Sequence, residues 1–246
     1  MLSKDQINKY QQKFEQLKRK TSGSGAFYFF KDGTTRIRLL PDDSGTFYRD
    51  VAMHYLPGTK RLVWCQSGSG HGDCIICEKL SELEQKGKDV RQYVAKGKSL
   101  ANGVVRGAEK NPCVLVLGTM VQKQILQFLL DPDYGDPCDV KIGYDIDIDK
   151  SGQGLDTEYA VKPRPQKTPL DQDRKIVLSM LDNRSDLSTV TVMDQQELIK
   201  IWDVFARGGN KSASADISDD EIPADDEDDT FNSPHIARVT SKKFKK

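Results

Sequence analysis

The sequence predicts a mainly β protein with flanking helices, preceded by a helical arm and followed by an acidic tail. Three observations lead to this prediction: strand-like alternation in the first half, helix-like segments before residue 209, and a run of acidic residues beyond it. In the first strand, Thr35, Ile37 and Leu39 alternate with Arg36 and Arg38, which is the period of a half-buried strand.

The other elements follow from the same kinds of pattern. Beyond residues 26–40, strands are expected within 47–65, where a pair surrounds the Pro57-Gly58 turn, and at 114–117, 140–148 and 157–161. Helices are expected at 74–87, 122–130, 171–182 and 194–207, the last ending at Gly208-Gly209. Residues 26–209 therefore form the predicted core, and the chain of 246 residues has room for one such domain plus extensions.

Residues 1–25 read as a separate helical arm. Ser3 opens a capping-box pattern, and apolar residues follow at spacings of three and four, which indicates an amphipathic helix over 4–20. A Thr-Ser-Gly-Ser-Gly joint at 21–25 then detaches it from the core. The apolar stripe must be buried, either on the chain's own domain or on a neighbouring molecule.

Charge is distributed unevenly, although the formal net charge is zero. Residues 1–125 hold 21 Lys and Arg against 12 Asp and Glu, and residues 126–246 hold 16 against 25. This asymmetry indicates a basic binding surface and an acidic tail. Residues 216–230 contain nine acidic side chains and no basic one, so we expect residues 210–246 to be disordered, with a basic end at Lys242–Lys246.

Four residues have the spacing of a zinc site. His54, Cys65, Cys74 and Cys77 follow the pattern H-x10-C-x8-C-x2-C, and the last two cysteines have the spacing that lets two thiolates bind one tetrahedral ion. Four N and S ligands leave no position for a reactive water, so the predicted role of one Zn²⁺ is structural. Buried or redox-active cysteines are the alternative interpretation.

Two histidines, His54 and His71, are candidates for the fourth ligand. His71 lies three residues before Cys74, and local spacing alone slightly favours it over His54. Cys113 and Cys138 stand alone in apolar or turn contexts, where a core role is expected.

These features resemble, in order, the T-even bacteriophage single-stranded DNA-binding (helix-destabilising) protein family. The matching stretches are Arg36–Pro41 (R-I-R-L-L-P), the His54, Cys65, Cys74 and Cys77 set, and Gly135–Val140 (G-D-P-C-D-V). The resemblance runs over roughly residues 15–230. The family carries three basic residues followed by two hydroxyl residues before its arm helix; here Lys18, Arg19, Lys20, Thr21 and Ser22 come after it.

The resemblance implies an OB-fold core with an inserted zinc-binding subdomain at about residues 50–90 and His54 as the fourth ligand. It also implies an arm for cooperative contacts with neighbouring copies, through the basic and hydroxyl cluster at 18–22. The acidic tail would recruit replication and recombination proteins. The implied function is cooperative coating and protection of single-stranded DNA during phage DNA replication, recombination and repair, in the cytoplasm of an infected bacterial host.

A single-strand site of this kind needs cations for phosphates and ring faces for bases. Both are interleaved along the first half of the chain, where some of the rings must belong to the core. The residues that we expect to contact DNA are Arg36, Arg38, Tyr48, Arg49, Trp64, Arg91 and Tyr93.

Other functions are less well supported by the sequence. A zinc-stabilised RNA-binding or transcription-regulatory module is the main alternative, because sequence does not reveal contacts to a 2′-hydroxyl. Asp145, Asp147 and Asp149 alternate on one strand and suggest a Mg²⁺-dependent nuclease, although a solvated strand face is the expected reading. No P-loop, G-x-S-x-G motif, long apolar run or N-terminal secretory pattern is present, so we expect a reduced, cytosolic, membrane-free, non-enzymatic protein.

Overall fold

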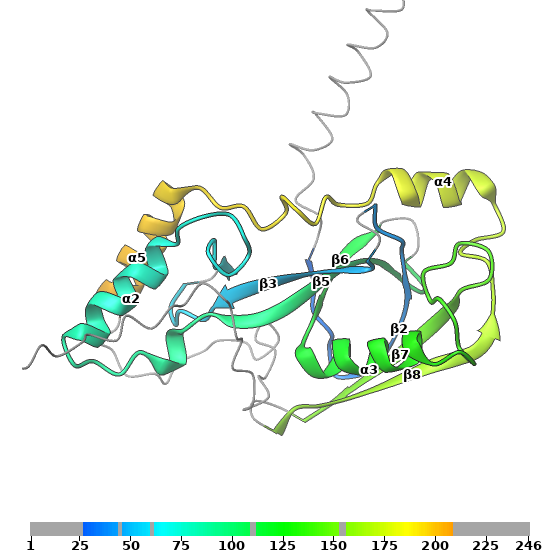
Figure 1. Ribbon diagram of the computed structural model, residues 1–246, viewed down its shortest axis with the longest axis horizontal. Helices are drawn as coiled ribbons and strands as arrows, with labels where there is room; N and C mark the ends of the chain where they lie inside the picture. The colour runs from blue at the N-terminus through cyan, green and yellow to red at the C-terminus, as the bar shows by residue number, and fades with distance from the viewer. Residues whose placement is uncertain (1–26, 44–45, 60–61, 109–111, 153–155, 209–246) are drawn as a thin grey trace, which may run out of the picture.

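The computed structural model describes residues 27–43, 46–59, 62–108, 112–152 and 156–208 (Figure 1). The predicted arm at 1–25, including the basic and hydroxyl cluster at 18–22, lies outside the described residues, as does the predicted tail at 210–246. The described part is mainly β with a few helices, as the sequence predicts. No helix in it is long and apolar enough to cross a membrane.

The described residues contain eight strands and five helices, one of which is a 3-10 turn. The strands are β1 (Phe27–Tyr28), β2 (Gly33–Leu39), β3 (Tyr48–His54), β4 (Val63–Trp64), β5 (Lys96–Val105), β6 (Cys113–Leu117), β7 (Tyr144–Ser151) and β8 (Glu158–Lys167). The helices are α2 (Ile75–Gln85), η1 (Arg91–Tyr93), α3 (Thr119–Leu130), α4 (Arg174–Asp182) and α5 (Gln195–Gly208).

Strand β5 is the centre of the sheet. The main strand order is β1-β6-β5-β2-β7-β8, and β3 pairs with both β4 and β5. All pairs are antiparallel except β1 with β6. Along β5, Lys96–Ala101 pair with β3, Ser99–Gly103 with β6 and Gly103–Val105 with β2. The sequence pattern does not predict this strand, because both of its faces are buried and the buried polar residues Lys98 and Asn102 hide any alternation.

The two last strands also differ from the prediction at their ends. β7 begins at Tyr144 rather than near residue 140, because the carboxylate of Asp139 accepts hydrogen bonds from the backbone of Lys141 and Ile142 and closes a turn there. β8 continues to Lys167 through Pro163 and Pro165. An edge strand tolerates proline, since its outer N–H positions have no partner strand.

The core has two main centres that lie at opposite ends of the molecule. One is formed by β2, β6, β7 and α3, around Ile37, Leu115, Ile125 and Ile146. The other joins α2 and α5 to the predicted metal-binding cysteines. Figure 1 shows α2 and α5 side by side at one end, with β3 and β5 running from there toward β2, β7 and β8. The cysteine-bearing segment is therefore packed by a helix that lies more than 100 residues later in the chain.

Residues 183–193, here called the crossing segment, connect α4 to α5 and run across the sheet (Figure 1). Asn102 on β5 fixes one end, because its side chain donates to Ser185 O and accepts from Ser185 N at 2.9 and 3.0 Å. Leu187 packs against Leu100 and Trp64 beneath it. The segment thus places α5 against α2.

We predict that Leu198→Ala lowers the free energy of unfolding by about 2–5 kcal/mol, because it opens a cavity between α5 and the cysteine-bearing end. Leu198 has no exposed surface, whereas the neighbouring Ile199 is 46% exposed. Urea denaturation of Leu198→Ala beside Ile199→Ala measures the difference. Equal destabilisation by the two variants would show that α5 does not hold this end together.

Candidate metal centre and nucleic-acid contacts

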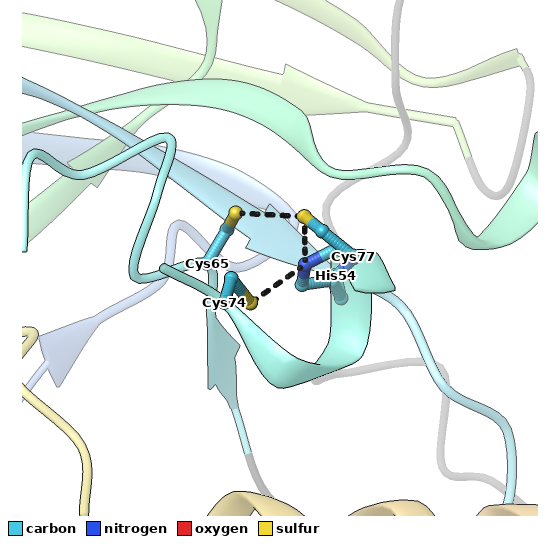
Figure 2. Close-up of side chains that lie close together, drawn as sticks. All are labelled: His54, Cys65, Cys74 and Cys77. Carbon is cyan, nitrogen blue, oxygen red and sulfur yellow. Dashed lines mark hydrogen bonds between the residues drawn. The ribbon is translucent and has the colours of Figure 1, made fainter. Parts of the chain in front are cut away.

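Four side chains from three elements meet in one buried cluster (Figure 2). His54 ends β3, Cys65 follows β4, Cys74 is the N-cap residue of α2, and Cys77 lies in its first turn. Pairing of His54 with Val63 joins β3 to β4, and Cys65 N donates to Ala52 O at 2.8 Å. The short hairpin and the helix start therefore bring these side chains together.

The cluster has the dimensions of a tetrahedral zinc site. Cys65 Sγ lies 3.5 Å from Cys77 Sγ, and His54 Nε2 lies 3.5 Å from Cys77 Sγ and 3.6 Å from Cys74 Sγ. Zinc bonds of about 2.3 Å to sulfur and 2.0–2.1 Å to nitrogen place tetrahedral ligand atoms about 3.5–3.8 Å apart. All four donor atoms lie within 4.8 Å of one another, close enough for one zinc ion to bring them together.

The imidazole of His54 is oriented by a contact outside the cluster. Its Nδ1 lies 3.0 Å from the backbone oxygen of Tyr93, and its Nε2 faces the thiols. A proton on Nδ1 donates to that carbonyl and leaves the Nε2 lone pair for a metal ion, which is the usual arrangement of a zinc-bound histidine.

The electrostatics of the cluster also favour a cation. Hydrogen bonding with Cys65 lowers the pKa of the Cys74 thiol and raises the pKa of the Cys77 thiol, because thiols this close cannot all ionise without a cation between them. Burial disfavours a charged His54, but hydrogen bonds with Cys65 and Cys74 outweigh it and raise the His54 pKa to about 10. Without a cation at its centre, the cluster therefore retains protons on Cys77 and His54 that a bound metal ion would displace.

Gly68 allows the loop after Cys65 to fold back on β3. A Cβ atom at this position would lie 2.4 Å from the side chain of Ala52, so no larger residue fits. Gly68 N also donates to Cys65 Sγ at 3.3 Å. The loop therefore contributes both the turn and a hydrogen bond that stabilises a thiolate.

His71 lies outside the cluster and contacts the crossing segment instead. Its Nε2 is 2.8 Å from Thr191 Oγ1, and burial together with the nearby Arg49 lowers its pKa. Gln66 reinforces this attachment, because its side chain donates to Thr191 O and accepts from Met193 N at 3.1 Å each. The slight preference for His71 from local spacing is thus not matched by the geometry. Sequence reasoning missed Gln66, which carries no motif.

The three alternating aspartates of β7 are engaged with basic side chains. Asp147 binds Arg36 at 2.7 Å and Arg164 at 3.3 Å, and Asp149 binds Lys162 at 2.6 Å. Asp145 binds Arg106 at 2.8 Å and Arg38 at 3.2 Å. Each of these carboxylates is already engaged by an arginine or a lysine, so this row is not the simply solvated face that the sequence predicts.

Two of the expected DNA-contacting residues are buried. Arg38 has no exposed surface and donates to Thr168 O and Asp139 O as well as to Asp145. Trp64 is 3% exposed and its ring centre lies 5.1 Å from that of Phe27. Both side chains hold the fold together in this structure and offer no surface to a nucleic acid. The alternation along β2 predicts that Arg36 and Arg38 share one face of the strand. It does not reveal that α4 and its flanking loops cover the end of this face where Arg38 lies.

The other expected contacts have exposed surface but differ in their surroundings. Arg36 and Arg91 are ion-paired with Asp147 and Asp89, respectively. Arg49 has no carboxylate partner among the described residues, and its Nε is buried without a hydrogen bond. The rings of Tyr48 and Tyr93 are half-buried, edge-on to Phe47 and Phe205. The expected residues do not form one continuous group: Arg36 lies on the β2 and β7 face, whereas Tyr93 belongs to the α5 end.

The fold and the site define a mainly β protein that carries a candidate metal centre of one histidine and three cysteines at one end of its sheet. The model of the gp32 DNA binding protein like family matches residues 31–203, and the chain belongs to that family. The resemblance to the T-even phage single-stranded DNA-binding proteins is thereby confirmed. No curated protein matches the chain in a direct sequence comparison.

We predict that His54→Ala loses the bound zinc, whereas His71→Ala retains it, because only His54 faces the thiols. Metal analysis of the purified variants gives the stoichiometry, and Cys77→Ser serves as a positive control that also lowers the melting temperature. Zinc should dissociate on acidification, since the thiolates and the imidazole must be deprotonated to bind it. Retention of zinc by His54→Ala and its loss from His71→Ala would reverse the assignment.

Proposed function

We propose that the protein coats and protects single-stranded DNA cooperatively, without catalysis, during phage DNA replication, recombination and repair. The observation that carries this proposal is membership of the gp32 DNA binding protein like family over residues 31–203, which contain the complete His54, Cys65, Cys74 and Cys77 cluster. The setting that we infer is the cytoplasm of an infected bacterial host.

One Zn²⁺ ion held by His54, Cys65, Cys74 and Cys77 would have a structural role. Four protein ligands fill a tetrahedral shell and leave no place for a reacting water. When bound, the ion supplies positive charge that the thiolates lack. The residues themselves tie β3, β4 and α2 together, and α5 packs on the same cluster. This end of the molecule can then hold a fixed shape against a flexible strand.

We infer that the sheet is an OB-fold core, residues 26–209, with the zinc subdomain of about residues 50–90 inserted in it. Support comes from the antiparallel strands that converge on β5 and from the helix α3 that covers one end of the core. OB-folds bind single strands by combining a basic groove with aromatic rings.

Among the expected contacts, Arg49 has the strongest structural support. It lies on β3 beside the loop after Cys65, and a Cβ atom at Gly70 would be 3.8 Å from its Nη2. A guanidinium without an internal carboxylate partner is available for a phosphate at less cost than one that must first break an ion pair. Arg36, Arg91, Tyr48 and Tyr93 are the remaining proposed contacts.

The segments outside the described residues complete the proposal. Residues 1–25, with Lys18, Arg19, Lys20, Thr21 and Ser22, would contact a neighbouring copy on the strand. The acidic tail, residues 210–246, would compete with DNA for basic side chains and engage replication and recombination proteins when displaced.

We predict that the protein binds single-stranded DNA in preference to duplex DNA and that Arg49→Ala weakens this binding. Loss of one phosphate contact should reduce the log–log salt slope by about 0.7. A fluorescence titration at several salt concentrations measures both effects, with Arg174→Ala on α4 as a control of equal charge. Because Arg49→Ala removes an unsatisfied buried nitrogen, its melting temperature should not fall. Failure of the wild-type protein to bind single strands, or cleavage of labelled strands in Mg²⁺, would contradict the proposed function.

We predict that deletion of residues 1–22 abolishes cooperative binding to long strands, because the apolar stripe of the arm would no longer dock on the next molecule. Affinity for an oligonucleotide of one site should change far less. Titrations with one-site and many-site oligonucleotides separate the affinity for a single site from the cooperativity between neighbouring molecules. An equal loss of affinity on both lengths would assign the arm to DNA contact instead.

A further inference from the structure

A cavity of about 310 Å³ lies where β7 and β8 meet the turn that follows α3. Figure 1 places the end of β8 on the side of the molecule away from α2 and α5. The cavity is lined by Asp131, Asp133, Tyr134, Tyr144, Arg164, Pro165 and Lys167. Its volume is at the lower end of the range for ligand pockets, about 300–1,000 Å³, which suits one small ligand unit.

An irregularity in β8 creates the basic wall of this cavity. Ile146 pairs with Pro163 and Tyr144 pairs with Lys167, so three residues of β8 stand opposite one residue of β7. On a regular strand, Arg164 and Lys167 would point to opposite faces, because they are three residues apart. The bulge brings both side chains to the same cavity. Bulges commonly redirect side chains in this way beside functional sites.

These two cations are not fully neutralised by the described part of the chain. The Arg164 Nη1 atom lies 3.3 Å from Asp147, which also binds Arg36, so two guanidinium groups share one carboxylate. Lys167 is exposed and forms no ion pair with a described residue. Its Nζ lies over the turn, 3.8 Å from where a Cβ of Gly135 would be. The β8 wall therefore suits an anionic group such as a phosphate.

The opposite wall combines aromatic rings with carboxylates. Tyr144 is 1% exposed, whereas Tyr134 is half-buried and its ring is supported at 5.2 Å by Phe128 and at 6.2 Å by Tyr144. The turn holds Tyr134 in place, because Tyr134 N donates to Asp131 O at 3.1 Å. The carboxylates of Asp131 and Asp133 are acceptors for N–H groups and would repel an anion on their own side.

We propose that this cavity binds one nucleotide, with its phosphate on Arg164 and Lys167 and its base against Tyr134. The carboxylates of Asp131 and Asp133 accept hydrogen bonds from N–H groups of the base. A nucleotide combines an anion, a ring and N–H donors, which is the combination that the two walls complement. The source of the nucleotide is the bound DNA strand, an assignment that rests on the proposed function. A free nucleoside monophosphate has the same chemistry, so the experiment must separate the two.

The test compares Tyr134→Leu, Tyr134→Phe and Lys167→Ala with Lys175→Ala, which removes an exposed lysine from α4. Base stacking of about 1–3 kcal/mol corresponds to a loss of roughly fivefold or more in strand affinity for Tyr134→Leu, and Tyr134→Phe should restore it. Lys167→Ala should reduce the log–log salt slope by about 0.7, while Lys175→Ala leaves it unchanged. Because Tyr134 packs against other rings, melting curves accompany each variant, and the exposed Lys167 provides a readout that does not disturb packing.

The outcomes distinguish this proposal from the proposed function. If the wild-type protein binds single strands and both Tyr134→Leu and Lys167→Ala match Lys175→Ala, the cavity proposal is wrong and the function stands. If the wild-type protein binds no single strand, the function itself fails. Titration with deoxyadenosine monophosphate alone is the third arm. Binding that is lost in Lys167→Ala while strand affinity is unchanged would overturn the strand as the source.

Discussion

The close approach of three cysteine side chains, two buried and one half-buried, is the constraint on which one end of this protein depends. The donor atoms of Cys65, Cys74, Cys77 and His54 lie within 4.8 Å of one another, and the same cysteines pack against α5. A cation at their centre converts a cluster that resists ionisation into a cross-link between β3, β4 and α2. Because α5 packs against the same cysteines, a metal ion bound there would also stabilise the position of this helix.

A second constraint acts on the charges of the sheet. The aspartates of β7 each hold one or two basic side chains, and the innermost pair includes an arginine with no exposed surface. Burying a cation is tolerable only when hydrogen bonds and a carboxylate compensate for lost hydration, and Arg38 has both. Three basic residues of the first half, Arg36, Arg38 and Arg106, are therefore engaged within the sheet. Fewer cations remain for a nucleic acid than the composition suggests.

The features of the fold and site that the sequence predicts are those determined by residues close together in the chain. Cys65, Cys74 and Cys77 share a short segment whose spacing predicts a metal site, whereas the choice of His54 over His71 follows from the family resemblance and not from local spacing. Strand β5 was missed because Lys98 and Asn102 are buried polar residues whose partners lie elsewhere in the chain. The burial of Arg38 and Trp64 was missed for a related reason. Arg38 is buried by Asp139 and Thr168, and Trp64 is buried by the crossing segment. Only the tertiary fold brings these distant segments near the two side chains.

Basic residues differ in how readily they can bind a phosphate, depending on whether they already have a carboxylate partner. A cation whose carboxylate partner is preformed must lose that partner before it binds phosphate, so its net contribution is small. Arg49 and Lys167 have no such partner within the described residues, and Arg164 shares one carboxylate with Arg36. They lie on different parts of the fold: Arg49 is on β3 beside the loop that follows Cys65, and Arg164 and Lys167 are at the end of β8. If the proposed contacts at Arg49 and at the end of β8 are all used, the bound strand crosses the sheet from one to the other.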